Sequence, residues 1–319
     1  MSREVLAVTD LEISFATESG RYTVVEGVSF SINTGEVLGL VGESGCGKSV
    51  TAMSLVSLLP SPPSHREKGS IKLSGKEIAG LPESELQKIR GAEVGFIFQE
   101  PMSSLNPVLT IGYQLSEALL LHQKINKKQA HEKAVEMLNL VGVSDPELRT
   151  EQYPHELSGG MRQRVMIAMA LMCSPKLLIA DEPTTALDVT IQAQILDLLN
   201  SLRSKLGMAI LMITHDLGVV AETCSHVVVM YAGRIIESGP VAEVFGNPKH
   251  PYTKALIASS PRGAARQSQL PTIPGIVAAP ADRKVGCSFA PRCLLVTEKC
   301  RVDKPMLTAD AHAVECWHA

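Results

Sequence analysis

A glycine-rich loop between a short apolar segment and a helical pattern constrains the fold of this chain more than any other feature. The loop reads GESGCGKS from Gly42 to Ser49, and its spacing, G-x-x-x-x-G-K-[ST], is that of a phosphate-binding loop. The segment before it, Glu36 to Val41, is short and almost continuously apolar, as is typical of a strand buried on both faces of a parallel sheet. A strand, this loop and a helix beginning near Lys48 predict a P-loop in an α/β fold.

The length and composition fit one large domain, or one domain with an appendage. The 319 residues are 45% hydrophobic, and the net charge of −3 with a pI of about 6.3 gives no reason to expect binding to nucleic acid. The start of the chain, MSREVLAVTD, lacks the apolar stretch of a secretory signal. No apolar run reaches the roughly 18 to 20 residues that cross a bilayer, so we expect the chain to stay in the cytosol.

Alternating apolar and polar residues from Leu6 to Phe15 and from Thr23 to Ile32 predict an antiparallel β subdomain. A second buried strand, Val94 to Phe98, ends at Gln99. We interpret residues 100–175 as an inserted helical subdomain, because apolar residues recur there at spacings of three and four. The helical patterns cover Ile111 to Leu121, Lys127 to Val141 and Gly160 to Met172.

Short apolar strands resume after the helical segment and indicate a parallel α/β sheet. They are Leu177 to Ala180, Ala209 to Thr214 and Val227 to Met230, with a helix predicted from Thr190 to Lys205. Beyond Ser259 several prolines interrupt a stretch without periodicity, which is typical of a linker. We therefore expect one domain over residues 1–259, and a linker with a Cys-rich C-terminal extension over residues 260–319.

Short motifs follow the P-loop in a fixed order. LSGGM occupies Leu157 to Met161, LLIADE ends at Glu182, TALD ends at Asp188, and the lone His215 closes a further apolar strand. This order resembles the ABC ATPase family. The resemblance implies an α/β P-loop NTPase fold with a parallel core sheet, the antiparallel β subdomain, the inserted helical subdomain and the Cys-rich extension.

The P-loop spacing assigns the phosphate-binding residues. Helix N-termini attract anions, and Lys48 is expected to contact the β- and γ-phosphates of ATP while Ser49 binds Mg²⁺. The expected ATP-binding residues are Gly42, Glu43, Ser44, Gly45, Cys46, Gly47, Lys48 and Ser49. In this family an aromatic side chain upstream also stacks on adenine, and Tyr22 is favoured over Phe15 for that role.

Three further residues, Glu182, Gln99 and His215, are candidates for catalysis, and Asp181 is a candidate ligand of Mg²⁺. Asp181 ends an apolar strand and is expected to hold Mg²⁺, and the resemblance implies that the adjacent Glu182 is the general base. Gln99 resembles the family's Q-loop glutamine, which contacts Mg²⁺ and the attacking water, and its loop extends from Glu100 to Pro107. His215 resembles the switch histidine that contacts the γ-phosphate.

The LSGGM motif implies a dimer. Ser158, Gly159 and Gly160 begin a helix and can offer hydroxyl and N–H groups to the γ-phosphate bound by the opposite subunit. Met161 stands where many family members have Gln, but the phosphate-contacting Ser and Gly residues are intact. Asp188 is expected to link the two sites across the dimer interface.

Four of the seven cysteines lie near the C-terminus: Cys287, Cys293, Cys300 and Cys316. Four thiolates suit zinc or an iron–sulfur cluster equally, and four unrelated thiols are the remaining interpretation. The stretch GCSFAPRC from Gly286, followed by Cys300, Pro305 and Cys316, resembles the C-terminal extension of ATPase subunits of dipeptide and oligopeptide importers. That resemblance implies a [4Fe–4S] cluster, with Zn²⁺ as the alternative.

The resemblance to peptide-importer ATPases covers essentially the whole chain. It includes YPHELSGGMRQRVMIAMAL from Tyr153, ADEPTTALDVT from Ala180 and NPKHPYTKAL from Asn247. It implies an ATP-hydrolysing subunit that powers import of dipeptides or oligopeptides through a membrane permease complex. Expected partners are a second ATPase subunit, identical or related, two transmembrane permeases and, indirectly, an extracytoplasmic solute-binding protein.

The expected location is the cytoplasmic face of the plasma membrane, with peripheral attachment. Two alternatives stay open. The solute could be nickel or another compound, because the cargo contacts other subunits. A soluble ABC ATPase acting on ribosomes or DNA is the second alternative, although the long coiled coils or fused second cassette common in such proteins do not occur here.

Overall fold

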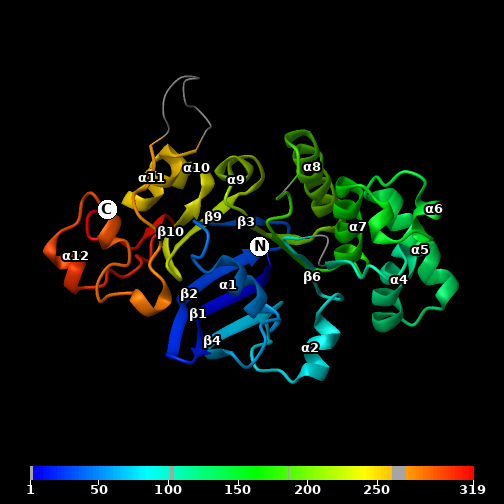
Figure 1. Ribbon diagram of the computed structural model, residues 1–319, viewed down its shortest axis with the longest axis horizontal. Coiled ribbons are helices and arrows are strands. Elements are labelled where there is room, and N and C mark those ends of the chain that lie inside the picture. Colours follow the sequence, from blue (N-terminus) through cyan, green and yellow to red (C-terminus); the bar gives the residue numbers. More distant parts are fainter. Residues whose placement is uncertain (1–2, 101–103, 186, 261–270) are drawn as a thin grey trace. The chain divides into compact units, whose positions relative to one another are not determined.

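The computed structural model describes residues 3–100, 104–185, 187–260 and 271–319 (Figure 1). The remaining residues, which include parts of the predicted Gln99 loop, the TALD motif and the linker, lie outside the described residues. The chain divides into two compact units. The first consists of Met1–Ala79 and Met212–Ala319, and the second consists of Gly80–Leu211.

The first unit contains a four-stranded antiparallel sheet in the order β2-β1-β4-β5. Strands β1 (Glu4–Thr17) and β2 (Gly20–Asn33) confirm the predicted antiparallel subdomain. Their apolar residues, such as Leu11, Ile13 and Val28, are buried. The other two strands are β4 (Ser64–Leu73) and β5 (Lys76–Glu77). β4 was not predicted, because its charged middle is exposed and only residues near its ends are buried.

A second set of strands in this unit carries the P-loop. β3 (Val37–Val41) is buried at all five positions and pairs in parallel with β9 (His226–Tyr231). β10 (Arg234–Pro240) pairs antiparallel with β9, and β11 (Ala313–Val314) pairs antiparallel with β10. The predicted strands pair in parallel where β3 meets β9, but β10 and β11 were not predicted, and with them the sheet is mixed. The reason is the turn at Ala232 and Gly233, whose φ values of 47° and 83° form a two-residue hairpin connection that reverses the chain.

Five helices accompany these strands in the described part of the first unit. They are α1 (Lys48–Leu55), α9 (Leu217–Thr223), α10 (Val241–Gly246), α11 (Pro251–Ala258) and α12 (Glu298–Val302). The C-terminal segment packs onto this unit, because Phe289 is buried with Tyr231 and Tyr252 in one hydrophobic cluster. The short C-terminal region thus shares the core of the unit.

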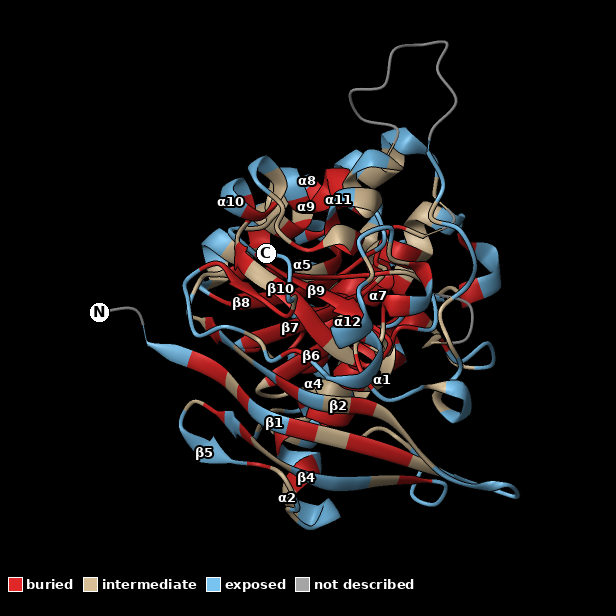
Figure 2. Cartoon of the chain, turned by 90° about the vertical axis from the view of Figure 1, so that its left-hand side faces the viewer, coloured by how far each residue is buried: buried red, intermediate tan, exposed pale blue. Residues whose placement is uncertain are grey.

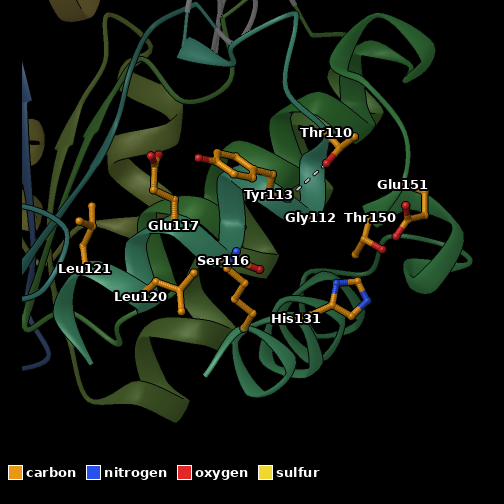
Figure 3. Close-up of a pocket in the computed structure, with 11 residues that line it drawn as sticks. Thr110, Gly112, Tyr113, Ser116, Glu117, Leu120, Leu121, His131, Thr150 and Glu151 are labelled. Atoms are coloured by element: carbon orange, nitrogen blue, oxygen red, sulfur yellow. Dashed lines mark hydrogen bonds between the residues drawn. The ribbon is translucent and has the colours of Figure 1, made fainter. Parts of the chain in front are cut away.

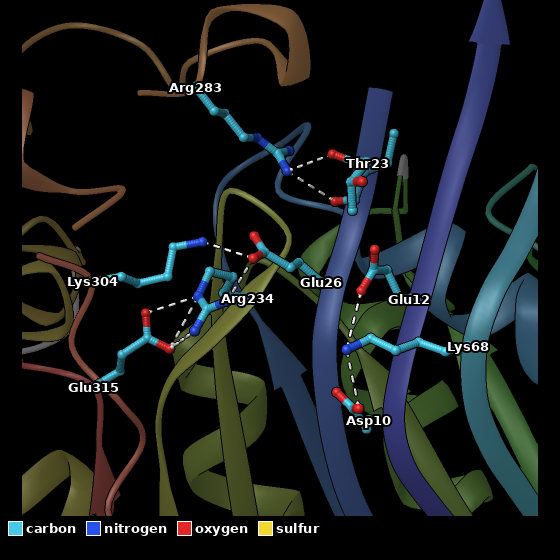
Figure 4. Close-up of polar contacts among 10 residues, drawn as sticks. Asp10, Glu12, Thr23, Glu26, Lys68, Arg234, Arg283, Lys304 and Glu315 are labelled. Atoms are coloured by element: carbon cyan, nitrogen blue, oxygen red, sulfur yellow. Dashed lines mark hydrogen bonds and ion pairs between the residues drawn. The ribbon is translucent and has the colours of Figure 1, made fainter. Parts of the chain in front are cut away.

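Polar contacts also tie the C-terminal segment to β2 and β10 (Figure 4). Lys304 pairs with Glu26 at 2.7 Å, and Arg234 pairs with both Glu26 at 3.2 Å and Glu315 at 2.8 Å. Arg283 donates to the backbone carbonyl of Thr23 at 3.0 Å. These contacts join residues more than 80 positions apart and fix the tail to the strands beside the P-loop.

The second unit contains the strands β6 (Val94–Ile97) and β7 (Leu177–Asp181), which pair in parallel. β8 (Ala209–Ile213) is the other neighbour of β7, and the boundary between the units falls within it. Figure 2 shows that β7, β8 and β9 are buried over most of their length. Their continuous apolar sequences are consistent with strands that are covered on both faces.

Four helices of the second unit match the predicted segments to within a few residues: α4 (Ile111–His122), α5 (Lys127–Leu140), α7 (Gly159–Leu171) and α8 (Val189–Leu206). In contrast, α2 (Glu83–Ile89) and α6 (Pro146–Thr150) were not predicted. The helices α4, α5, α6 and α7 pack together (Figure 1), whereas α2 and α8 lie outside this group. Asn126 and Gln129 form a reciprocal capping box at the start of α5. None of the helices in the described residues is both long and apolar enough to span a membrane.

Candidate functional site

The predicted P-loop wraps around the N-terminus of α1. Gly47 precedes the helix with φ 108°, and Gly42 has φ 153°. A Cβ atom on Gly42 would lie 2.3 Å from the carbonyl oxygen of Met230, so only glycine fits there. The loop closes through a hydrogen bond from the Cys46 N–H to the Glu43 carbonyl at 3.3 Å. This is a helix N-terminus of the kind that binds phosphate.

Lys48 is buried at the first position of α1, with 6% of its surface exposed. Its Nζ donates to the carbonyl oxygens of Gly42 at 2.7 Å and Glu43 at 3.1 Å. The ammonium group of Lys48 therefore links the end of the loop to the carbonyl groups of its first two residues. Ser49, next in the helix, is partly exposed, while Ser44 and Gly45 are exposed at the tip of the loop.

The structure brings together two of the predicted catalytic residues in the second unit. Gln99 Nε2 donates to Glu182 Oε2 at 3.2 Å. The register of β6 and β7 explains this contact, because Ile97 lies opposite Ala180 and each functional residue follows two positions later. The carboxyl ends of parallel strands are where open α/β sheets bind their ligands.

Glu182 is held in an unusual conformation. Its φ of 47° lies in the left-handed region, which costs a non-glycine residue about 1–2 kcal/mol. Its carboxylate oxygen Oε2 also accepts a hydrogen bond from Thr185 Oγ1 at 2.7 Å, so two donors, Gln99 and Thr185, hold the same oxygen. Asp181, the preceding residue, ends β7 and is 5% exposed. Backbone strain of this kind is often found at functional sites.

His215 follows β8 and is exposed in the first unit. The N–H of Thr214 donates to the carbonyl of Leu40 at 3.4 Å, two residues before the P-loop begins. Asp216 caps α9 by accepting from the N–H of Gly218 at 2.7 Å. These backbone contacts place His215 at the end of β3 from which the P-loop emerges.

The LSGGM motif begins α7 as predicted. Ser158 is the N-cap, and its Oγ accepts from the Met161 N–H at 3.4 Å. Ser158 and Gly159 are exposed, and a Cβ on Gly159 would meet no atom within 4 Å. The hydroxyl and the first N–H groups of this helix are thus accessible to another molecule.

Comparisons with known proteins identify the family. The ABC transporter family model matches residues 25–185, and the model of the oligopeptide/dipeptide transporter C-terminal region matches residues 236–300. A probable peptide ABC transporter ATP-binding protein of Sinorhizobium fredii is 52% identical, over 99% of this chain and 95% of that protein. This chain belongs to the ABC transporter family.

Other relatives and solved structures agree with this assignment. The oligopeptide transport ATP-binding protein OppD of Bacillus subtilis is 49% identical, over 98% of this chain and 88% of its own length. The dipeptide transport ATP-binding protein DppD of Escherichia coli is 46% identical, over 98% and 96%. A dimeric ATP-binding cassette bound to ADP and phosphate has a TM-score of 0.67 at 25% identity, covering 74% of this chain and 98% of its own.

Two further residues that the sequence analysis singled out, Asp188 and Tyr22, have local contacts in the structure. Asp188 is the N-cap of α8, accepting from the N–H of Ile191 at 3.0 Å, and its surface is exposed. Tyr22 lies opposite Phe15 in the β1–β2 register, so the two aromatic residues share one face of the sheet. Tyr22, and not Phe15, lines an open pocket of about 460 Å³. None of the P-loop residues Gly42 to Ser49 lines this pocket, so the role of Tyr22 in stacking on adenine stays a prediction.

The four late cysteines do not form a metal-binding group. Among the described residues, no set of three or more His, Cys, Asp or Glu side chains is arranged to hold a metal ion. Cys300 Sγ lies 3.5 Å from His318 Nε2, and burial raises the pKa of Cys287 to about 11. Burial also raises the pKa values of Cys293 and Cys316. The structure therefore does not show the predicted cluster among the described residues.

Sequence reasoning missed two residues that contact the P-loop. Arg292 forms an ion pair with Glu43, and Tyr252 accepts a hydrogen bond from the Glu43 N–H. Both residues lie in stretches that carried the resemblance to peptide importers, HPYTKAL and APRC, but neither received a role. Their separation from the P-loop by more than 200 residues hid the contact.

Proposed function

We propose that this chain is the ATP-hydrolysing subunit of an importer for dipeptides or oligopeptides. The observation that carries this function is similarity along the full chain, including its C-terminal region, to proteins named as ATP-binding subunits for peptide transport. The P-loop and the Gln99–Glu182 pair supply groups suited to ATP hydrolysis. We assign the ATPase domain to residues 1–259 and the extension to residues 260–319.

In this proposal the P-loop residues Gly42 to Ser49 bind the phosphates and Tyr22 stacks on adenine. Glu182 polarises the attacking water, and Gln99 orients Glu182 and that water. His215 contacts the γ-phosphate. The buried carboxylate of Asp181, the hydroxyl of Ser49 and the amide oxygen of Gln99 are hard oxygen donors that suit Mg²⁺. Bound Mg²⁺ would neutralise charge on the phosphates.

A second ATPase subunit would complete each site through Ser158, Gly159 and Gly160. Support comes from the exposure of Ser158 and Gly159 and from the empty space around Gly159. The helix N-terminus at this point is suited to a phosphate group. Asp188, exposed at the start of α8, would connect the two sites.

The permease partner would bind the helical subdomain. A pocket of about 490 Å³ opens between α4 and α5, and its wall includes Tyr113, Leu120 and Leu121 (Figure 3). These side chains are 55%, 39% and 74% exposed. The lining also includes charged residues such as Glu117 and Lys127, so the groove suits an amphipathic helix of a partner, whose apolar face would cover the exposed tyrosine and leucine side chains. In this proposal the ATPase lies peripherally on the cytoplasmic face of the plasma membrane.

The decisive experiment is reconstitution of this chain in proteoliposomes with two peptide permeases and a solute-binding protein. A dipeptide or tripeptide should accumulate in the lumen only with ATP, and the Glu182→Gln variant should abolish accumulation. Transport of nickel without transport of peptide would favour the alternative cargo. Copurification with ribosomes or DNA, and with no permease, would favour the soluble alternative.

The [4Fe–4S] cluster stays a prediction that rests on the resemblance of the cysteine spacing, with Zn²⁺ as its alternative. The measurement is absorption near 400 nm together with metal analysis of anaerobically purified protein. Zinc without that absorption rejects iron, and the absence of both metals assigns four unbound thiols.

A further inference from the structure

Three separate contacts fix Glu43, the second residue of the P-loop. Its N–H donates to Tyr252 Oη at 2.9 Å, and its carbonyl accepts from Lys48 Nζ at 3.1 Å. Its carboxylate accepts hydrogen bonds from both terminal nitrogens of Arg292, at 2.6 Å and 3.0 Å. The Glu43 carbonyl also accepts from Cys46, so the position of Glu43 determines the turn that shapes the loop.

The Arg292–Glu43 pair is bidentate and largely shielded from water. The side chains of Arg292 and Glu43 are 6% and 26% exposed. Arg292 also donates to the Pro274 carbonyl at 2.7 Å, and its guanidinium lies 5.8 Å from the ring centroid of Tyr231. Two parallel hydrogen bonds hold a carboxylate in a defined orientation better than a single ammonium group does.

Tyr252 and Arg292 are themselves held by the C-terminal region. Tyr252 is fully buried on α11, and its ring packs against Phe289 at 5.5 Å between centroids. Phe289 precedes the short 3₁₀ helix Ala290–Arg292. The contacts shown in Figure 4 then anchor the tail to β2 and β10. A rigid support therefore extends from the tail to the P-loop.

We propose that Arg292 and Tyr252 are positioning residues of the nucleotide site. Acting through Glu43, they hold the first turn of the P-loop in the shape that presents its N–H groups to phosphate. The C-terminal region is thus part of the machinery that binds ATP, in addition to any other role. This inference rests on the proposed function of the P-loop in binding ATP.

The test compares steady-state ATP hydrolysis by the full chain and its variants, at a temperature where all are folded by circular dichroism. Tyr252→Phe removes only the hydroxyl, and Arg292→Met removes the bidentate pair while keeping an apolar side chain. Each should raise the KM for ATP by about tenfold with a smaller change in kcat, because a ground-state contact with phosphate is misplaced. Arg292→Lys should restore part of the loss.

A double-mutant cycle separates positioning from simple loss of stability. If Arg292 acts through Glu43, Arg292→Met combined with Glu43→Gln should raise KM no more than the worse single variant does. The matched control is Arg301→Met, because Arg301 lies in the same tail and is 57% exposed. It should leave KM unchanged.

Three results would overturn the proposal: KM values within about twofold of wild type for Tyr252→Phe and Arg292→Met, additive effects in the cycle, or an equal rise in KM for Arg301→Met. Failure of the proposed function would look different. In that case the wild-type chain would neither bind nor hydrolyse ATP, whatever the state of the tail.

Discussion

Gln99 and Glu182 are hydrogen-bonded across the ends of two parallel strands, with 3.2 Å between Nε2 and Oε2. The amide therefore lies against the carboxylate proposed as general base, and Thr185 donates to the same oxygen, Oε2, of that carboxylate. A change in the charge or position of the Glu182 carboxylate would change this hydrogen bond and, through Gln99, the position of the loop that follows. Hydrolysis and movement of the helical subdomain would be linked at this contact.

Replacing Glu182 with Gln should retain ATP binding and lower turnover by about 10²-fold or more, because a positioned base is lost while the loop keeps its shape. Binding is measured by titration calorimetry and turnover by phosphate release. Glu93→Gln is the matched control, since Glu93 lies before β6 and pairs with Lys176 on the surface at 2.8 Å. Full turnover by Glu182→Gln would remove Glu182 from the mechanism.

Gly42→Ala should abolish ATP binding and destabilise the chain by about 2 kcal/mol or more, because its Cβ would lie 2.3 Å from the Met230 carbonyl. Gly75→Ala tests strain alone, since Gly75 has φ 82° and an added Cβ would meet nothing within 4 Å. Urea unfolding and ATP titration of both variants check this. Equal loss of ATP binding in the two would contradict a specific role for Gly42.

Gly159→Glu should keep the thermal stability of the isolated chain and abolish its ATPase activity. The added side chain has room in one subunit, but it would place a negative charge where the partner's γ-phosphate is proposed to bind. Gly246→Glu is the control, because a Cβ there also meets no atom within 4 Å and the residue ends α10. Activity of Gly159→Glu equal to that of the control would argue against sharing of the site.

Burial lowers the pKa of His250 to about 4, from an ordinary value of 6.5. Below pH 6.5 the unfolded chain therefore takes up a proton that the folded chain does not bind, and stability falls as the pH drops from about 6.5 toward about 4. Between pH 7 and pH 5 this group should remove about 2 kcal/mol from the free energy of unfolding.

His250→Asn can still cap α11, where His250 Nδ1 accepts from the Tyr252 N–H at 3.0 Å, but it does not titrate. Urea unfolding of both proteins at the two pH values isolates the contribution of His250. The groups facing it that titrate or carry charge are Glu237 and Lys254, and both are retained in the variant. An identical pH dependence in the two proteins would refute this assignment.

The parts of the site that the sequence could predict are those encoded by local patterns. The P-loop is recognisable because one glycine-rich segment contains the turn, the lysine and the helix start. Glu182 and Gln99 could be placed because each follows a short apolar strand, and parallel pairing brings such ends together. The helices α4, α5 and α7 of the second unit followed from the spacing of their apolar residues.

Other features depended on distant contacts or on single turns. The hairpin at Ala232 and Gly233 adds antiparallel strands that apolar runs alone do not distinguish from parallel ones. The pair of Arg292 with Glu43 joins residues 249 positions apart, and no local pattern encodes it. The spacing of the four late cysteines suggested a ligand set, but among the described residues these thiols are not arranged as one.

The left-handed backbone at Glu182 has a practical consequence for trapping this enzyme. The left-handed conformation costs free energy for every residue type except glycine. A glutamine at position 182 should therefore adopt the same backbone geometry as glutamate and preserve the resting shape of the loop. A glycine would instead relax the turn and gain stability while losing its carboxylate. For crystallisation or cryo-microscopy of an ATP-loaded complex, Glu182→Gln is therefore a better variant than Glu182→Gly.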